Sequence, residues 1–286
     1  MELAVTSDHL TRILRDMQQV LVCFSGGVDS GFLLAVAVRT LGDQATAFTA
    51  VSPSLADDEL ADAKQFAQQL GARHILVETN EVSDSRYVAN PANRCYFCKT
   101  EVYGVAVQQA HRMGIAYVLD GFNADDRGDY RPGRQAAREW GIRSPLDEAS
   151  MTKAEIRELA RTLGLSLWDK PAMACLSSRL PYGTAVTPER LQQVWQCERV
   201  LHDLGFRICR VRHYGLEARI EVPPNEIDRL FLPAVRSQII TQFQHHGFAT
   251  VAVDLQGYRT GSLNEALLAG NLSAETHQGV VALIAP

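Results

Sequence analysis

The sequence predicts an α/β protein, in which a doubly wound, mostly parallel sheet is followed by a smaller α+β domain. Three observations lead to this fold class. Short apolar runs alternate with helical periods through the first half, a glycine-rich loop follows the first apolar run, and an irregular segment at 172–187 separates two differently patterned halves. A chain of 286 residues is long enough for two ordinary domains, which we place at residues 1–183 and 184–286.

In the first domain, short apolar runs predict buried strands joined by crossover helices. The expected strands are residues 19–24, 45–51, 73–77 and 116–119. The expected helices are residues 31–41, 55–70, 100–113 and 153–163. The last helix has a capping box of Thr152 and Glu155 at its start and Gly164 at its end. Because a doubly wound sheet binds ligands outside the carboxyl ends of its strands, the loops that follow the strands are candidate site loops.

In the second domain, we expect helices segregated from an antiparallel sheet. The pattern predicts, in chain order, a helix over 188–204, strands over 207–213 and 217–222, a helix over 225–247 and a strand over 250–255.

Composition and charge predict a cytosolic protein without membrane or nucleic-acid partners. The formal charge is −5, and no apolar run approaches the roughly 18 to 20 residues that cross a bilayer. Glu2 and Asp8 stand where a signal peptide would carry positive charge. The 28 cations comprise 24 Arg and 4 Lys. Arginine binds phosphate and carboxylate through two donors, so the excess of arginine over lysine suits an anion-binding site. A biased genomic composition explains this excess equally well.

A glycine loop, Ser-Gly-Gly-Val-Asp-Ser, lies between the first expected strand and the helix after it. Glycines let backbone amides approach an anion, and a helix N-terminus adds partial positive charge, so the loop predicts a phosphate cradle. It fits neither the P-loop nor the dinucleotide fingerprint. It resembles the PP-loop of ATP pyrophosphatases, in which loop amides and Ser hydroxyls hold pyrophosphate and the Asp lies near Mg²⁺; the alternative is a self-capped glycine turn. The candidate ATP-binding residues are Ser25, Gly26, Gly27, Asp29 and Ser30.

Six cysteines divide into two sets by position. Cys95 and Cys98 form a C-x-x-C pair ahead of a helix, and Cys175 lies in the irregular segment, so we expect all three in loops of the first domain. In a reducing compartment these thiols bind metal or perform redox chemistry. Three thiolates suit a [4Fe–4S] cluster with one open iron, and the alternatives are a dithiol redox pair or simple packing. The cysteines that we expect in the core are Cys23, Cys197 and Cys209.

Acidic residues gather after the fourth expected strand, at the carboxyl edge of the sheet. Such a loop either holds Mg²⁺ and the nucleotide or forms a solvated turn. The candidates are Asp120, Asn123, Asp125, Asp126 and Asp129.

Two arginines of the second domain share a strand face. Arg210 and Arg212 alternate with apolar positions, and two guanidinium groups at that spacing can hold a phosphate and a carboxylate. The alternative is a lattice of ion pairs with acids of the next strand. Glu198 and Glu221 are candidates for a divalent metal, against the commoner role of such acids on an exposed surface.

Longer motifs resemble the LarE-type sulfur transferases over nearly the whole chain. Besides the PP-loop they comprise Asp-Gly-Phe-Asn at 120–123, the helix at 153–163, Cys-Leu-Ser-Ser-Arg at 175–179, Arg-Val-Arg at 210–212 and Gly-Tyr-Arg-Thr-Gly at 257–261. The resemblance implies a homo-oligomeric enzyme that uses ATP and Mg²⁺ to adenylylate the carboxylates of pyridinium-3,5-biscarboxylic acid mononucleotide. Sulfur then replaces AMP, giving thiocarboxylates for the nickel-pincer nucleotide of lactate racemase.

The cysteines distinguish two varieties of this family. Some members sacrifice the sulfur of a single cysteine at the place of Cys175. This sequence is similar to the three-cysteine members, in which the thiolates hold a [4Fe–4S] cluster that carries an extra sulfide, because it adds Cys95 and Cys98. The resemblance therefore implies that Cys175 is a cluster ligand, with a sacrificial Cys175 as the alternative. Arg179, close in sequence to Cys175, is expected to be a catalytic residue near the reacting centre, together with the three cysteines. The expected substrate-binding residues are Ser178, Arg210 and Arg212.

Three rival functions fit parts of the pattern. A tRNA thiolase also joins a PP-loop to a C-x-x-C pair and a third cysteine, but RNA binding asks for a basic surface and this chain carries −5. An amidating enzyme of the NAD or asparagine synthetase kind would leave the cysteines without a role. An ATP-binding iron–sulfur sensor would bind ATP without releasing pyrophosphate.

Overall fold

The computed structural model describes residues 2–128, 131–171, 174–259 and 261–262. The chain forms two compact units, of which the first ends at Cys175 and the second begins at Leu176. This division falls a few residues before the expected boundary at residue 183. The candidate acid Asp129, and Thr260 of the last motif, lie outside the described residues.

Four parallel strands form the sheet of the first unit, in the order β3-β2-β1-β4. They are β1 (Val20–Cys23), β2 (Ala45–Val51), β3 (Arg73–Glu78) and β4 (Tyr117–Leu119). This arrangement confirms the predicted α/β fold. The chain runs outward from β1 to β3 and then returns to place β4 on the other side of β1. The carboxyl ends of β1 and β4 therefore flank the switch point where such sheets bind ligands.

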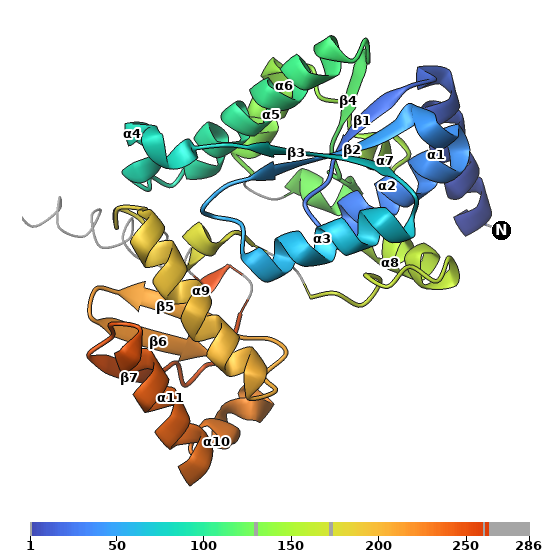
Figure 1. The fold of residues 1–286 in the computed structure, drawn as a ribbon. Coiled ribbons are helices and arrows are strands. Elements are labelled where there is room, and N and C mark those ends of the chain that lie inside the picture. Colours follow the sequence, from blue (N-terminus) through green and yellow to red (C-terminus); the bar gives the residue numbers. More distant parts are fainter. Residues whose placement is uncertain (1, 129–130, 172–173, 260, 263–286) are drawn as a thin grey trace, which may run out of the picture. The chain divides into compact units, whose positions relative to one another are not determined.

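Helices cover both faces of this sheet (Figure 1). The helices that pack on one face are α1 (Glu2–Met17), α2 (Val28–Leu41), α3 (Asp57–Gln69) and α8 (Lys153–Thr162). Those on the other are α5 (Arg94–Arg112) and α6 (Gly133–Glu139). Because side chains alternate along a strand, Val20 and Val22 of β1 belong to the first core and Leu21 to the second. Each core supports the loops at the sheet edge from its own side.

Several helix boundaries differ from the predicted ones. No element was predicted before residue 19, yet α1 fills that segment and buries Leu10 and Leu14. Helix α2 begins at Val28 and α5 at Arg94, each several residues earlier than expected, while the polar stretch before α5 folds into η2 (Glu81–Ser83) and α4 (Ser85–Val88). The capping box of α8 is confirmed: Glu155 N donates to Thr152 Oγ1 at 3.3 Å, and Thr152 N donates to Glu155 Oε2 at 2.8 Å.

The second unit has a three-stranded sheet in the order β5-β6-β7. Its strands are β5 (Arg210–Tyr214), β6 (Glu217–Glu221) and β7 (Thr250–Val253). The expectation of an antiparallel sheet is wrong for one pair, since β5 and β6 are antiparallel but β6 and β7 are parallel. A parallel pair needs a crossover connection, and the helices between β6 and β7 provide it.

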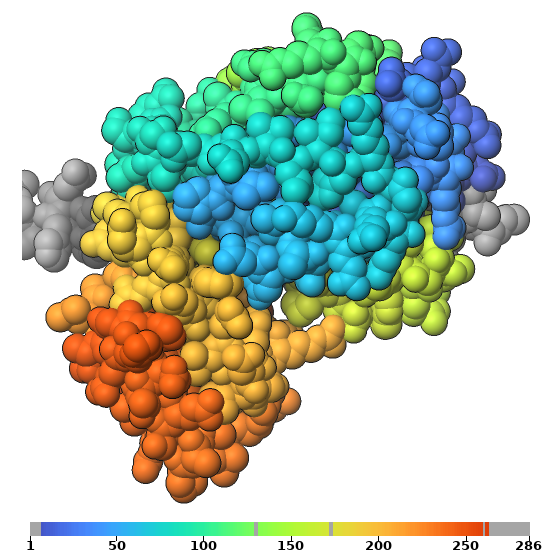
Figure 2. Space-filling model, in the orientation of Figure 1, coloured from blue at the N-terminus to red at the C-terminus, as the bar shows by residue number. Residues whose placement is uncertain are grey.

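Two longer helices, α9 (Pro188–Asp203) and α11 (Pro233–His245), pack against each other in this unit. In the space-filling view of Figure 2, the atoms of α9 are yellow and those of α11 are orange-red. The single helix expected at 225–247 is divided into η5 (Pro224–Glu226), α10 (Ile227–Leu230) and α11, because Pro233 cannot continue a helix and starts a new one instead. Among the described helices of the chain, none has the length and apolar character needed to cross a membrane.

Candidate functional site

The glycine loop joins β1 to α2 at the switch point of the parallel sheet. Gly26 adopts a φ of 79°, which favours glycine, and Gly27 is the N-cap of α2 without any side-chain cap. Ser30 Oγ accepts a hydrogen bond from Ser25 N at 3.3 Å and donates one to Gly27 O at 3.3 Å. The serine thus shapes the loop, and the first amides of a four-turn helix stay available for an anion.

The loop after β4 packs tightly against the first turn of α2. A Cβ atom added to Gly121 would lie 2.7 Å from Ser30 N and 3.0 Å from Ser30 Cα. Real Cβ atoms do not approach a backbone so closely, so only glycine fits between the two loops. This contact brings the loops after β1 and β4 together, as the sheet topology predicts.

Asp120 follows β4 directly and is occupied by contacts within the first unit. Its Oδ1 accepts hydrogen bonds from Ser144 Oγ at 2.6 Å and Phe122 N at 3.2 Å, and its Oδ2 accepts one from Tyr103 OH at 3.0 Å. Arg134 extends this network, since it donates to Ser144 Oγ at 2.6 Å and stacks on Phe122. Both carboxylate oxygens of Asp120, a predicted nucleotide ligand, therefore already accept hydrogen bonds that hold the loop after β4.

Asp126 and Asp29 form a small acidic centre beside the glycine loop. Asp126 lies in η3 (Ala124–Gly128), is only 3% exposed, and has Arg131 Nη2 and Lys153 Nζ each 2.7 Å from Oδ1. Burial and the charge of Asp126 raise the pKa of Asp29, while Lys153 and Arg157 act to lower it. Two acids and several cations thus meet at the first turn of α2. Such a mixture of charges suits a polyphosphate with its divalent cation.

Cys95 and Cys98 lie in the first two turns of α5, and not in a loop as expected. The helix begins at Arg94, before the residues whose apolar pattern predicted it. Cys175 lies at the end of the first unit without helix or strand structure, as expected. None of the three cysteines forms a disulfide bond.

Electrostatic effects link the three thiols. Burial raises the pKa of Cys95, and the next largest cause is Cys175. Burial also raises the pKa of Cys98, followed by the charge of Glu81 and then by Cys175. The residue Cys95 is nevertheless exposed, while Cys98 and Cys175 are half-buried.

Two residues that act on these thiols were not predicted from the sequence. Arg94 is 5% exposed, hydrogen bonds to Asn90 Oδ1, and acts by charge and hydrogen bonding to lower the pKa of Cys95. Glu81 is 2% exposed and lies in η2, which contacts α5. Arg94 could have been suspected as the neighbour of a C-x-x-C cysteine. Nothing in the sequence distinguishes Glu81 from the other acids of its polar stretch, because its burial depends on tertiary packing.

The thiols do not form a site for a single metal ion. Among the residues that the structure describes, no three His, Cys, Asp or Glu side chains are arranged to hold one ion. A cluster of four irons holds its cysteines further apart than one ion does, so it makes a different demand on geometry. The remaining cysteines agree with their expected packing role: Cys197 and Cys209 are fully buried, and Cys23 is half-buried against the second core with a pKa raised by burial to about 12.

In the second unit, two glutamates predicted as metal ligands are bound by arginines instead. Arg179 donates from Nε and Nη2 to the two oxygens of Glu198, at 2.9 and 2.8 Å. Arg212 holds Glu221 in the same way, at 2.9 and 2.7 Å. The metal-ligand expectation for Glu198 and Glu221 therefore finds no support, because both carboxylates already have a fixed, buried counter-charge.

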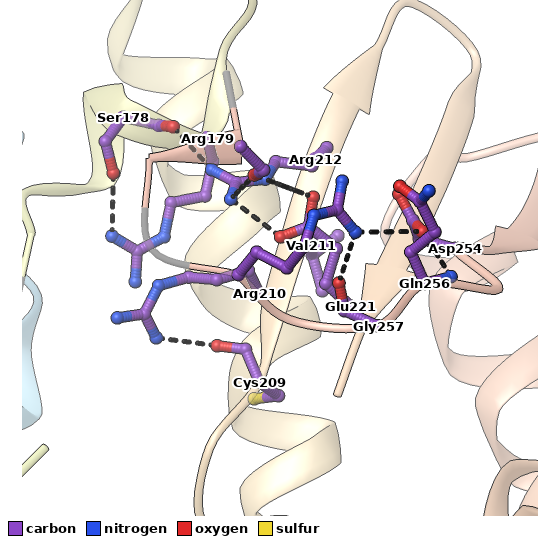
Figure 3. A network of polar contacts seen from close by, with 12 residues as sticks. Ser178, Arg179, Cys209, Arg210, Val211, Arg212, Glu221, Asp254, Gln256 and Gly257 are labelled. Atoms are coloured by element: carbon purple, nitrogen blue, oxygen red, sulfur yellow. Dashed lines mark hydrogen bonds and ion pairs between the residues drawn. The ribbon is translucent and has the colours of Figure 1, made fainter. Parts of the chain in front are cut away.

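Figure 3 shows how Arg212 joins separate segments of the second unit. Besides Glu221, it donates to the Ser178 carbonyl at 2.7 Å and to Ser262 Oγ at 2.9 Å. Arg212 is 6% exposed. Arg212 therefore forms an ion pair with an acid of the next strand, which was the predicted alternative to phosphate binding. The pair is buried, whereas the prediction placed it on a solvated sheet.

Arg210 lies on the same strand in a different environment. It donates to the Cys209 carbonyl at 2.7 Å and its guanidinium is 5.2 Å from the centre of the Tyr258 ring. Burial, and next the like charge of Arg179, lower the pKa of Arg210. In Figure 3 the guanidinium groups of Arg179 and Arg210 lie near each other, beside Ser178. Two neighbouring guanidinium groups attract an anion, and an anion would relieve their repulsion.

One family model and three relatives bear on these sites. A family model described as asparagine synthase matches residues 5–165. An uncharacterised protein of Synechocystis sp. is 46% identical over 260 residues, which cover 91% of this chain and 97% of that protein. The pyridinium-3,5-bisthiocarboxylic acid mononucleotide synthase of Lactiplantibacillus plantarum is 38% identical over 272 residues, which cover 95% and 98%. A tRNA-specific 2-thiouridylase of Treponema denticola is 27% identical and matches only 51% of this chain.

The parallel sheet, the glycine loop at its switch point and the matched family model define an ATP-using enzyme of the PP-loop class. The similarity to the Lactiplantibacillus protein extends through both units and narrows the class. The chain belongs to the LarE-type family of ATP-dependent sulfur transferases.

Proposed function

We propose that this enzyme converts the carboxylates of pyridinium-3,5-biscarboxylic acid mononucleotide to thiocarboxylates, as a step toward the nickel-pincer nucleotide of lactate racemase. The full-length similarity to a synthase of that bisthiocarboxylic acid mononucleotide supports this substrate. The observation that carries the proposal is the pairing, within the first unit, of a phosphate loop with three neighbouring thiols. Adenylylation needs the phosphate loop, and sulfur delivery needs the thiols.

The first step activates a carboxylate with ATP. A carboxylate oxygen attacks the α-phosphorus, the bond to the β-phosphate breaks, and pyrophosphate leaves. The amides at the start of α2 and the hydroxyls of Ser25 and Ser30 would hold the departing pyrophosphate. Asp29 fits Mg²⁺, because it stands beside the loop with a pKa raised by burial and by Asp126, and a cation would relieve that repulsion. Asp120 and Asp126 would keep the surrounding loop in place.

The second step replaces AMP with sulfur. We propose that Cys95, Cys98 and Cys175 hold a [4Fe–4S] cluster, which supplies a bound sulfide that stays nucleophilic and does not diffuse away. The donor set fits: the three cysteines are in no disulfide and act on one another by charge, and Arg94 and Lys99 act to stabilise the thiolate of Cys95. The attack on the acyl carbon releases AMP, a much better leaving group than oxide.

The second unit is proposed to bind the substrate mononucleotide. Arg210, with Arg179 beside it, would hold the phosphate, and Ser178 would add a hydroxyl contact. Arg212 would act by positioning, because its guanidinium is committed to Glu221 and to the Ser178 carbonyl. We further propose that the enzyme works as a homo-oligomer in the cytoplasm and does not bind nucleic acid.

A single-turnover experiment tests the proposed function. Anaerobically purified protein is mixed with ATP, Mg²⁺ and the biscarboxylic acid mononucleotide, and both product and protein are examined by mass spectrometry. We expect about four irons per chain, a thiocarboxylate product, and a Cys175 of unchanged mass. Iron-free protein that still forms thiocarboxylate while Cys175 loses its sulfur would establish the sacrificial alternative and exclude the cluster. The absence of both pyrophosphate release and thiocarboxylate formation would exclude the substrate, whereas pyrophosphate release without thiocarboxylate would exclude the proposed sulfur delivery.

A further inference from the structure

Lys99 of α5 is a half-buried lysine whose charge is not used by a carboxylate. Two other half-buried lysines, Lys153 and Lys170, form ion pairs with Asp126 and Asp62, at 2.7 and 2.9 Å. Within the part of the chain that the structure describes, Nζ of Lys99 has neither a hydrogen-bond partner nor an ion-pair partner. Partial burial removes hydration from an ammonium group, so one without a counter-charge indicates an anionic ligand.

Packing between α5 and α6 fixes the direction of this side chain. Its Nζ lies 5.3 Å from the centre of the Tyr103 ring. Its stem packs against Gly133, the first residue of α6, where an added Cβ would lie 2.9 Å from Lys99 Cγ. A free lysine loses much rotamer entropy when it binds a ligand, and a lysine already held by its neighbours loses less. Lys99 is therefore preorganised to bind an anion.

Lys99 lies between the thiols and the phosphate loop of the first unit. Residues four apart share a helix face, so Cys95, Lys99 and Tyr103 form one stripe along α5. Cys95 lies one turn before Lys99, at the thiol end of this stripe. At the other end, Tyr103 OH donates to Asp120 Oδ2 at 3.0 Å, and the next residue, Gly121, packs against the first turn of α2.

The proposed adenylylation brings two anions together at this place. A substrate carboxylate must approach the α-phosphate of ATP, although like charges repel at short range. The same carbon must afterwards be within reach of the sulfur donor. Arg131 and Lys153, the cations beside the glycine loop, already pair with Asp126. Lys99 supplies a positive charge that no described acid neutralises, between the two reaction partners of the carboxylate.

From this placement, and resting on the proposed function, we infer that Lys99 is a catalytic residue, whose Nζ donates hydrogen bonds to the substrate carboxylate that reacts with ATP. An oxygen of this carboxylate attacks the α-phosphorus, the bond from that phosphorus to the bridging oxygen breaks, and pyrophosphate leaves with the electron pair. Lys99 keeps its proton throughout. It offsets the repulsion between the two anions and directs the carboxylate toward the phosphorus.

The test measures substrate binding and adenylylation without any sulfur transfer. Full-length wild-type protein is compared with Lys99→Met, which keeps most of the stem but removes the ammonium group, and with the control Lys64→Met, exposed on α3. Isothermal titration calorimetry without ATP gives the affinity for two probes: the biscarboxylic acid mononucleotide, and the pyridinium mononucleotide that lacks both carboxylates. Exchange of labelled pyrophosphate into ATP, with the biscarboxylic acid present, measures adenylylation.

We expect Lys99→Met to bind the biscarboxylic acid about 10- to 100-fold more weakly than wild type, and the carboxylate-free probe equally well. Pyrophosphate exchange should slow by at least about tenfold. Lys64→Met should match wild type in every measurement.

Three results would overturn the inference while leaving the proposed function standing: an unchanged affinity of Lys99→Met for the biscarboxylic acid, an equal loss of affinity for both probes, or exchange at the wild-type rate. An equal loss for both probes would show that Lys99 only supports the fold of the site. Wild-type protein that neither binds the biscarboxylic acid nor exchanges pyrophosphate in its presence would instead overturn the proposed function, and the inference with it.

A second variant covers the case in which Lys99→Met does not fold, as judged by far-ultraviolet circular dichroism. Lys99→Gln keeps a polar end that can donate a neutral hydrogen bond, but it carries no charge. We expect a loss of affinity that is smaller than in Lys99→Met and again confined to the biscarboxylic acid, because charge-assisted hydrogen bonds are the stronger ones. Unchanged affinity of folded Lys99→Gln for the biscarboxylic acid would overturn the inference.

Discussion

Arg179 and Glu198 form a buried, bidentate ion pair at the start of the second unit. The two hydrogen bonds measure 2.9 and 2.8 Å, and the side chains are 4% and 7% exposed. Val211 N also donates to Glu198 Oε1 at 2.9 Å, so the pair fixes the backbone of β5. Burial acts to raise the pKa of Glu198, but the charge and hydrogen bonds of Arg179 outweigh it and hold that pKa below its ordinary value. This pair positions the strand that carries Arg210 and Arg212.

Glu198→Gln should lower the free energy of unfolding at pH 7 by about 3 kcal/mol, because it leaves the buried Arg179 without its counter-charge. The pKa of Glu198 is lower in the folded than in the unfolded protein, so the contribution of its charge is complete above the unfolded value and is lost as the pH falls through the folded value. The gap between wild type and variant should therefore narrow below about pH 4.5.

Urea unfolding at a series of pH values measures this gap. Glu217→Gln is the matched control, since its partner Arg219 lies 3.4 Å away and the two side chains are 38% and 39% exposed. We expect the control to change stability by about 0.5 kcal/mol or less. A gap for Glu198→Gln that stays constant down to the acid transition would show that Arg179 does not depend on the carboxylate charge.

Gly121→Ala should impair adenylylation without unfolding the protein. The added methyl group would lie 2.7 Å from Ser30 N, so the first turn of α2 or the β4 loop must move. A displacement of about 1 Å at such a loop can cost about 100-fold in rate. ATP-dependent release of pyrophosphate measures the effect. Gly128→Ala is the control, because no atom lies within 4 Å of its added Cβ, and equal activities of the two variants would refute the predicted contact.

Arg210→Gln should weaken substrate binding more than it slows turnover. The variant loses a guanidinium whose pKa is lowered by burial and by Arg179, and a substrate phosphate would lose a charge-assisted hydrogen bond. We expect KM for the mononucleotide to rise by about 10- to 100-fold, equivalent to about 1.5 to 3 kcal/mol, with a smaller change in kcat. Arg219→Gln, on the neighbouring strand, should leave KM unchanged. A fall in kcat alone would assign Arg210 to the chemical step instead.

Arg94→Met should lower the reduction potential of the proposed cluster. Arg94 stabilises negative charge on Cys95 by charge and hydrogen bonding, and this support favours the reduced, more negative cluster. Loss of about 1.4 kcal/mol corresponds to about 60 mV for one electron. Redox titration followed by electron paramagnetic resonance measures the shift. Arg112→Met, exposed at the far end of α5, should leave the potential unchanged, and equal potentials in both variants would refute the role of Arg94.

The fold of the first unit follows largely from local signals. The strands, the capping box of Thr152 and Glu155, and the glycine loop after β1 depend on residues close together in the chain, and the structure confirms all three. The parallel order then brings the loops after β1 and β4 together, as the alternation of strands and helices predicts. Local signals failed where a helix lacks a clear period, as at the start of α5, or contains an interior proline, as at Pro233.

The identity of the chemistry-bearing residues was thus available from residue type and spacing alone, because glycine loops and cysteine pairs need particular residues at fixed offsets. Their partners were not, because ion pairs and burial join residues far apart in the chain. Only the folded structure shows that Glu198 and Glu221 neutralise arginines, that Asp120 accepts hydrogen bonds from Tyr103 and Ser144, and that Glu81 is buried with a hydrogen bond from Ser54. Packing, which excludes water from a side chain, decides whether an acid is a surface charge or part of a site.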